Sequence, residues 1–139
     1  SGGWNFIKMM LISEKIFIKP IKKYSMQRKN EYELFAHEGE VEGICEMVEH
    51  IYLYRSSNES IEMSIGKNGI RYFYGYAINF QNSRRAERKI GENAVWFDEP
   101  KSAKRYFMGY ILQYREYFSD DCIKEIKKKL LETFTLPLI

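Results

Sequence analysis

Segment 37–50, with the sequence HEGEVEGICEMVEH, gathers the residue types that most often perform chemistry in proteins. It holds both histidines of the chain, one of its two cysteines and five glutamates. Histidine is the usual general base and metal ligand near neutral pH, and a cysteine beside a histidine can act as a nucleophile. A reactive site in this segment would therefore be a metal centre or a nucleophile–base pair.

The spacing of these residues does not favour a metal centre. The helical zinc motif of metalloproteases needs two histidines that bracket a glutamate as His-Glu-x-x-His. Here His37 precedes a glutamate, and Glu46 lies four residues before His50, so the segment lacks that motif. An exposed His50 paired with Glu46 one helical turn away explains the pattern without a metal. We predict no metal and no other cofactor.

The two cysteines do not favour covalent catalysis either. Cys45 falls at the edge of an apolar stripe, where cysteine usually acts as a small hydrophobic residue and burial raises the thiol pKa. Cys45 and Cys122 are too far apart in sequence for a paired zinc motif and too few for a disulfide framework. The chain also lacks a nucleophile elbow and a glycine-rich phosphate loop between a strand and a helix. The sequence therefore predicts a protein that is not an enzyme.

A helix from about Glu38 to Tyr54 is the element expected to position this segment. Six residues follow the spacing of one buried helical stripe: Val41, Ile44, Cys45, Val48, Ile51 and Tyr52. Four glutamates would share a neighbouring arc of that helix: Glu38, Glu42, Glu46 and Glu49. Like charges at this spacing repel by a few tenths of a kcal/mol per pair, so the arc is either a solvated face or a docking surface for a basic protein.

The rest of the chain predicts an antiparallel sheet. Ile61, Met63 and Ile65 alternate before an Asn-Gly pair, which predicts a β-hairpin over residues 61–80. Its second arm carries three tyrosines on one face, and we expect them to lie under the C-terminal helices: Tyr72, Tyr74 and Tyr76. Other extended segments are predicted at 11–24, which contains Pro20 and suits an edge strand, at 31–37, before Ile90 and at 94–97.

Two helices are predicted to close the chain. Asp98 can cap the first, which accepts Pro100 in its first turn and keeps an apolar stripe from Ala103 to Phe118. Ser119 and two aspartates begin the second. The predicted fold class is α+β: an antiparallel sheet, a meander with the 61–80 hairpin, packed by one N-terminal and two C-terminal helices.

Length and hydropathy indicate one domain that is soluble. The chain has 139 residues, enough for a single core, and we interpret residues 1–8 as an expression scar and leader and residues 9–139 as one domain. No apolar run approaches the roughly 18 residues that span a bilayer, so no membrane partner is expected. With reduced cysteines as the default, we expect a cytoplasmic protein.

Charge is distributed unevenly along the chain. Residues 1–29 carry seven Lys or Arg and one Glu, whereas residues 30–54 carry seven Glu and no base. Segregation of this kind hints at an electrostatic partner. An alternative partner is nucleic acid, because the cluster RRAERK offers four cations for phosphates: Arg84, Arg85, Arg88 and Lys89. The run 127–129 is explained by its place near a helix C-terminus.

A small, lysine- and tyrosine-rich α+β domain that carries the segment HEGEVEGICEMVEH resembles, in general style, the bacterial immunity proteins that neutralise secreted or contact-delivered toxins. The resemblance implies a non-enzymatic inhibitor that binds a basic toxin domain, often a nuclease, and blocks its substrate site. Under this interpretation the glutamates of the predicted arc, Glu38, Glu42, Glu46 and Glu49, contact Lys or Arg of the toxin.

Overall fold

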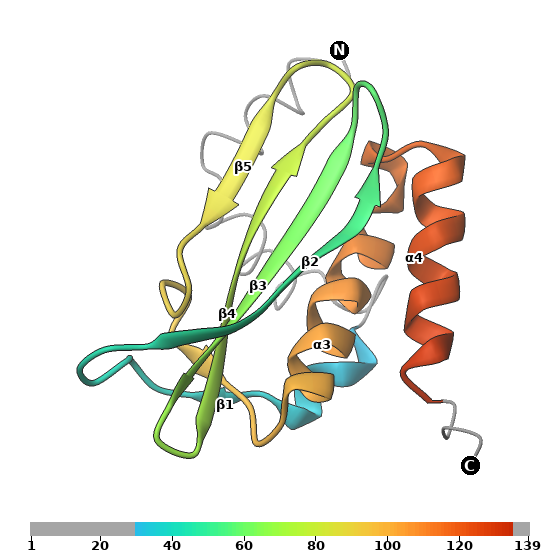
Figure 1. Cartoon of the computed structure of the whole chain (residues 1–139). Helices are drawn as coiled ribbons and strands as arrows, with labels where there is room; N and C mark the ends of the chain where they lie inside the picture. Colours follow the sequence, from blue (N-terminus) through green and yellow to red (C-terminus); the bar gives the residue numbers. More distant parts are fainter. Residues whose placement is uncertain (1–29, 135–139) are drawn as a thin grey trace.

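A four-stranded antiparallel sheet with two helices packed on one of its faces forms the body of the protein (Figure 1). The computed structural model describes residues 30–134. Its elements follow in chain order: η1 (Glu31–Phe35), β1 (His37–Glu38), β2 (Glu46–Arg55), β3 (Ser60–Asn68), β4 (Arg71–Asn79), β5 (Arg85–Arg88), β6 (Val95–Trp96), α3 (Pro100–Gln113), η2 (Arg115–Tyr117) and α4 (Asp120–Glu132). The α+β class predicted from the sequence is confirmed.

The main sheet is a meander in which each strand pairs antiparallel with the next, in the order β2-β3-β4-β5. Strands β1 and β6 form a separate two-stranded sheet beside it. The predicted hairpin is confirmed as β3 and β4, which are joined by a two-residue turn after the pair Asn68 and Arg71. Gly69, the first turn residue, has φ 62°, a left-handed value that glycine adopts without steric cost.

The core lies between the sheet and the helices. The inward face of β3 and β4 supplies Ile61, Met63, Ile65, Tyr74, Tyr76 and Ile78, and the helices add Phe107, Ile111 and Ile126. Tyr76 stacks on Phe107 with ring centroids 4.9 Å apart, and Tyr74 meets Tyr106 edge-on at 6.0 Å. The prediction that the tyrosine face lies under the C-terminal helices is confirmed for Tyr74 and Tyr76, while Tyr72 is half-buried at its end.

The helix predicted over 38–54 is wrong. Only residues 37 and 38 and residues 46–55 are regular there, and both stretches are strands. Gly43 has φ 88°, which a right-handed helix excludes, and β2 completes the sheet by pairing with β3. β-branched and aromatic residues such as Ile51 and Tyr52 fit a half-buried strand, so the tertiary pairing overrides the helical spacing. The predicted acidic helix face does not exist.

The N-terminal expectations meet two different outcomes. The strand predicted over 11–24 lies outside the described residues. The segment 31–37, predicted to be extended, forms the 3-10 helix η1 followed by β1. Asn30 caps η1 by accepting a hydrogen bond from the Tyr32 backbone N–H at 3.0 Å, and its own amide donates to the Tyr106 backbone oxygen at 3.0 Å.

The two C-terminal helices are confirmed, with changes at their ends. Ser119 caps α4 as predicted and accepts the Cys122 backbone N–H at 3.1 Å. Helix α3 begins at Pro100 after Glu99, so Asp98 is not its cap. The helix ends at Gln113 and a 3-10 turn follows, although the predicted stripe ran on to Phe118. No helix within residues 30–134 has the length and apolar character needed to cross a membrane.

Candidate functional site

The two histidines of segment 37–50 lie in separate environments. His37 Nε2 lies 3.0 Å from Asp98 Oδ2, and its ring stacks on Trp96 with centroids 4.2 Å apart. The Arg71 guanidinium covers Trp96 at 4.7 Å from the ring centroid. His50 Nε2 instead lies 3.0 Å from Glu62 Oε1 on the neighbouring strand, so the predicted Glu46 partner is wrong. Within residues 30–134, no three His, Cys, Asp or Glu side chains are grouped to hold a metal ion.

Both cysteines are held as neutral thiols. Cys45 is half-buried against β3, where a Cβ added to Gly66 would lie only 2.7 Å from its Sγ. Burial raises the pKa of the Cys45 thiol. Burial, together with the negative charge of Glu59, raises the pKa of Cys122 to about 12. These environments favour the packing role predicted for Cys45, because the thiolate is the reactive form of cysteine.

The four glutamates of the predicted arc are distributed over three places. Glu38 lies on β1, and Glu42 lies in the loop 39–45, whose backbone is held by the Asn68 amide. Glu46 begins β2 and is exposed. Glu49 is bound by Lys104 of α3, with Oε2 and Nζ 2.6 Å apart, so it is already paired within the protein.

Glu38 nevertheless belongs to an acidic site that the sequence did not reveal. A cavity of about 460 Å³, here called the acidic pocket, lies between η1, β1, residues 93–95 and α3. Glu33, Glu38 and Glu40 line it together with Tyr106 and Tyr110. Sequence reasoning missed Glu33 and Glu40 because neither falls on the predicted arc, and only the docking of η1 on α3 brings the tyrosines beside them.

Two phenols set the hydrogen bonding of the acidic pocket. The Tyr110 hydroxyl donates to Glu33 Oε1 at 2.9 Å, and the Tyr106 and Tyr110 hydroxyl oxygens lie 3.2 Å apart. Burial raises the pKa of Tyr106 to about 12 and raises the pKa of Tyr110 well above its usual value. Both phenols therefore remain neutral donors near neutral pH, and the carboxylates carry the charge of the pocket.

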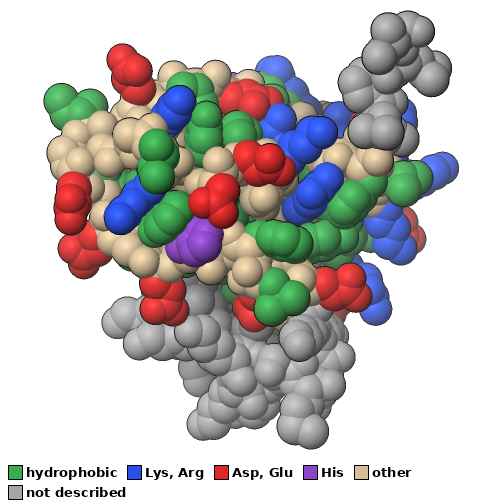
Figure 2. Space-filling view, turned by 90° about the horizontal axis from the view of Figure 1, so that it is seen from below, with side chains coloured by type: hydrophobic (Ala, Val, Ile, Leu, Met, Phe, Trp, Pro, Cys, Tyr) green, Lys and Arg blue, Asp and Glu red, His purple; other side chains and the backbone are tan. Residues whose placement is uncertain are grey.

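Large apolar side chains are exposed along the same stretch of chain. Leu34 is 84% exposed, Ile44 88% and Met47 61%, and Phe35 and Val48 are also exposed. We call residues 31–49 the acidic–apolar segment, since it contains seven glutamates and no Lys or Arg. Figure 2 views this end of the molecule and shows acidic and apolar side chains beside basic ones around the visible histidine.

The cluster predicted for nucleic acid, residues 84–89, does not form one surface. Arg85 donates to Asn79 Oδ1 at 2.9 Å and to Glu87 Oε2 at 3.1 Å. Arg88 lies opposite the buried Tyr76 and 3.8 Å from Glu92, and Lys89 precedes the following turn. Arg84 is exposed at the β4–β5 turn. The four cations predicted to act together therefore have separate surroundings.

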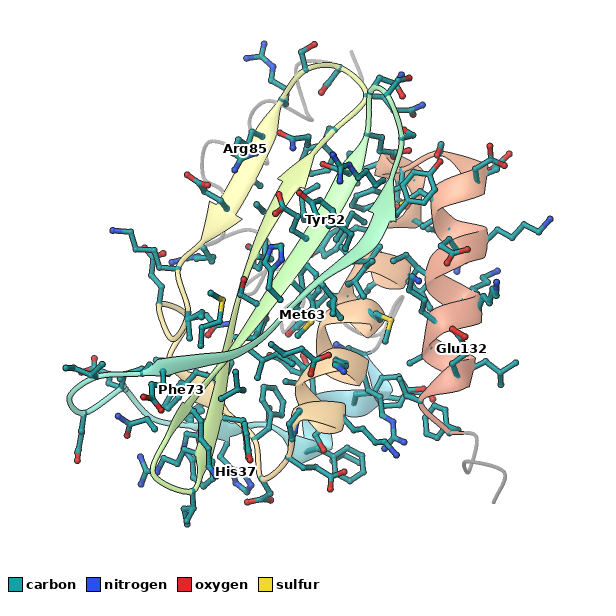
Figure 3. All side chains as sticks on the ribbon, in the orientation of Figure 1. His37, Tyr52, Met63, Phe73, Arg85 and Glu132 are labelled. Carbon is teal, nitrogen blue, oxygen red and sulfur yellow. The ribbon has the colours of Figure 1, made fainter. Side chains whose placement is uncertain are left out.

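Arg84 lines a second cavity, of about 410 Å³, at the other end of the sheet. This cavity lies between the β2–β3 turn, residues 56–59, and the β4–β5 turn, residues 80–84. Tyr52 and Arg55 at the end of β2 complete its wall. Figure 3 shows Tyr52 and Arg85 towards this end of the sheet and His37 at the opposite one.

Comparisons of the chain with models of known protein families, with curated proteins and with solved structures give no match. The function must therefore be inferred from these two ends of the molecule.

Proposed function

We propose that the protein is a non-enzymatic module that binds a basic protein through the acidic–apolar segment. The role that fits this chemistry is that of a bacterial immunity protein, which inhibits a basic toxin domain such as a nuclease. The observation that carries the proposal is the combination, in residues 31–49, of exposed large apolar side chains with glutamates and no Lys or Arg.

The exposed apolar side chains and the carboxylates would contribute to such a contact in different ways. Exposed apolar side chains such as Leu34 and Ile44 supply area that gains free energy when a partner buries it. The carboxylates around them attract a basic surface, raise the association rate and disfavour acidic competitors. Glu40 and Glu42 are exposed and form no ion pair or side-chain hydrogen bond among residues 30–134. They are therefore available to a partner.

The acidic pocket fits a single Lys or Arg side chain of the partner. A carboxylate has more acceptor sites than one phenol can use, so Glu33 keeps acceptor capacity while it binds Tyr110. A guanidinium between Glu33 and Glu40 would form charge-assisted hydrogen bonds, which are about twice as strong as neutral ones. The pocket would then give the contact an orientation that diffuse surface charge does not provide.

The direct test is charge reversal of the two available glutamates. The probe is the purified product of the gene immediately upstream, provided that it encodes a basic toxin domain, and affinity is measured by isothermal titration calorimetry. We expect the double variant Glu40→Lys/Glu42→Lys to bind at least about tenfold more weakly than the wild type, equivalent to about 1.4 kcal/mol. Its affinity should also depend less on salt.

A matched control carries the same change of charge elsewhere. Glu116→Lys/Glu132→Lys alters η2 and the end of α4, outside the acidic–apolar segment, and should bind within about twofold of the wild type. Equal weakening by both double variants would reduce the effect to net charge and contradict the proposed surface. Unchanged affinity in both would contradict it as well.

A further inference from the structure

The cavity between the β2–β3 and β4–β5 turns is lined by cations as well as carboxylates, whereas the charged groups that line the acidic pocket are all carboxylates. Two carboxylates and two guanidiniums belong to its lining: Glu59, Glu62, Arg55 and Arg84. A count of charges would call this cavity neutral. The two kinds of group nevertheless differ in their partners, because both carboxylates contact other groups of the protein and neither guanidinium has a carboxylate partner among residues 30–134.

Both carboxylates are occupied. Glu59 is buried, 2% exposed, and accepts hydrogen bonds from the backbone N–H and the hydroxyl of Ser119 at the start of α4. Glu62 lies 3.0 Å from the His50 ring nitrogen on the neighbouring strand. Glu59 is thus held at the start of α4, and Glu62 is held against β2.

Both guanidiniums lack a carboxylate partner among residues 30–134. Arg55 lies over the Tyr52 ring, with its Cζ 4.7 Å from the ring centroid, a contact that leaves the guanidinium N–H groups able to donate to a ligand. Arg84 is exposed, and its backbone N–H donates to Asn82 Oδ1 at 3.1 Å, which orders the turn that carries it. Arg55 ends β2 and Arg84 lies in the β4–β5 turn, and both residues line this cavity.

Neutral hydroxyl and amide groups also line the cavity. Ser56, Ser57 and Ser83 line the cavity, as does Asn79, whose amide donates to the Ser60 hydroxyl at 2.9 Å. Hydroxyl donors around two guanidiniums are the usual surroundings of a phosphate, and the planar fork of arginine matches two phosphate oxygens. The two turns that supply these groups lie side by side at one end of the sheet (Figure 1).

We propose that this cavity, which we call the cationic pocket, binds a phosphate group, with Arg55 and Arg84 as its two charged ligands and Tyr52 as the positioning residue for Arg55. The phosphate is carried by a free nucleotide or by the backbone of a single-stranded nucleic acid, two sources that share this chemistry. The site is separate from the proposed protein-binding surface, so either proposal can fail while the other holds.

The test titrates the full chain with three probes in low-salt buffer: inorganic phosphate, uridine monophosphate and a ten-residue oligouridylate. Binding is followed by calorimetry and by amide shifts in proton–nitrogen correlation spectra. We expect saturable binding that shifts the amides of residues 55–60 and 82–85. Preference for the oligonucleotide with a steep salt dependence would identify nucleic acid as the source, whereas equal affinity for the mononucleotide would identify the free ligand.

Variants assign the binding to this cavity. Arg55→Gln and Arg84→Gln should each lower the affinity for the tightest-binding probe at least about tenfold, since each removes one charged ligand. Arg85→Gln is the matched control, because it removes the same charge from the next residue, which binds Asn79 and Glu87 and does not line the cavity. That control should remain within about twofold.

Tyr52→Leu separates positioning from ligation. Loss of the ring that holds Arg55 should weaken binding about threefold, and Tyr52→Phe should restore it, because the ring and not the hydroxyl supports the guanidinium. The correlation spectrum of each variant confirms that it is folded. The proposal is overturned if none of the probes binds at about 10 mM, or if Arg55→Gln and Arg84→Gln bind as well as Arg85→Gln.

Discussion

The two ends of the sheet differ in which charged side chains lack a partner of opposite charge within residues 30–134. At the acidic end, Glu40 and Glu42 have no partner among residues 30–134 and large apolar side chains are exposed. At the other end the guanidiniums of Arg55 and Arg84 lack a carboxylate, although Glu59 lines the same cavity. A surface is thus defined by the charges that remain available after internal pairing, and the net charge of a segment is a poor guide to it.

The largest expected effect is a loss of stability when Glu59, at the end of the sheet that carries the cationic pocket, is replaced. Glu59 has a structural role, because it accepts hydrogen bonds from both the backbone N–H and the hydroxyl of Ser119. Glu59→Ala should lower the free energy of unfolding by about 3 kcal/mol, since the buried donors lose a charged acceptor. Urea unfolding followed by circular dichroism measures this loss. The exposed control Glu87→Ala should stay within about 0.5 kcal/mol, and equal stability of both variants would contradict an internal role for Glu59.

The second effect tests what builds the acidic end. A Cβ on Gly109 of α3 has no room beside the Asn30 side chain, which caps η1 and binds the Tyr106 backbone. Gly109→Ala should therefore displace η1 and destabilise the fold by about 1–2 kcal/mol, despite the helix propensity of alanine.

A double-mutant cycle isolates the contact between Asn30 and Gly109. In the Asn30→Ala background the Gly109→Ala change should cost less, because the closest side chain is absent and only the Tyr32 ring, 3.0 Å from the added Cβ, stays close. Urea unfolding of the four proteins of the cycle gives the coupling energy. Additive losses would show that Gly109 does not position η1 through Asn30.

The smallest effect is a pH dependence of the free energy of unfolding, caused by the Cys122 thiol near Glu59. Burial and the charge of Glu59 raise the pKa of Cys122 in the folded protein from the ordinary thiol value of 9.0 to about 12. When the pKa of a group is higher in the folded than in the unfolded protein, its full contribution to stability is present below the unfolded-state pKa. That contribution is lost as the pH rises towards the folded-state pKa. The free energy of unfolding should fall by about 1 kcal/mol between pH 9 and pH 10 through this thiol alone.

Cys122→Ala provides the reference for this slope. The variant lacks the titrating thiol, so its unfolding free energy should decline less than that of the wild type over the same pH interval. The comparison uses the difference in slopes, because the smaller side chain also leaves a cavity that lowers stability at every pH. Parallel slopes would show that the Cys122 thiol ionises equally well in the folded and unfolded chains.

Local signals predicted the elements that depend on local chemistry. Alternating apolar residues and Gly69 identified the β3–β4 hairpin, and Ser119 identified the start of α4. Strand β2 was predicted as a helix because its register shifts between Met47 and Glu49 and again between Tyr52 and Tyr54. These irregularities interrupt the period-two alternation that marks a strand and leave an apolar spacing that imitates a helical stripe.

The candidate sites depended on contacts between distant parts of the chain. The sequence identified Glu38 as part of an acidic surface. It did not identify Glu33, whose contact in the acidic pocket is with the Tyr110 hydroxyl, 77 residues further along the chain. Arg84 was identified, but Arg55 was not, because the two meet only when two turns of the meander lie side by side. Glu49 forms an ion pair with Lys104 of α3, a contact that no sequence signal indicated.

The shifts in register that concealed β2 also affect how the chain behaves at high concentration. In the described sheet β2 is an edge strand, and a flat, regular edge is a template on which another chain can add a strand. The extra residues twist the edge and break its ladder, and Glu46 places a charge at its beginning. These irregularities therefore disfavour the addition of a strand to β2 where Met47 and Val48 are exposed.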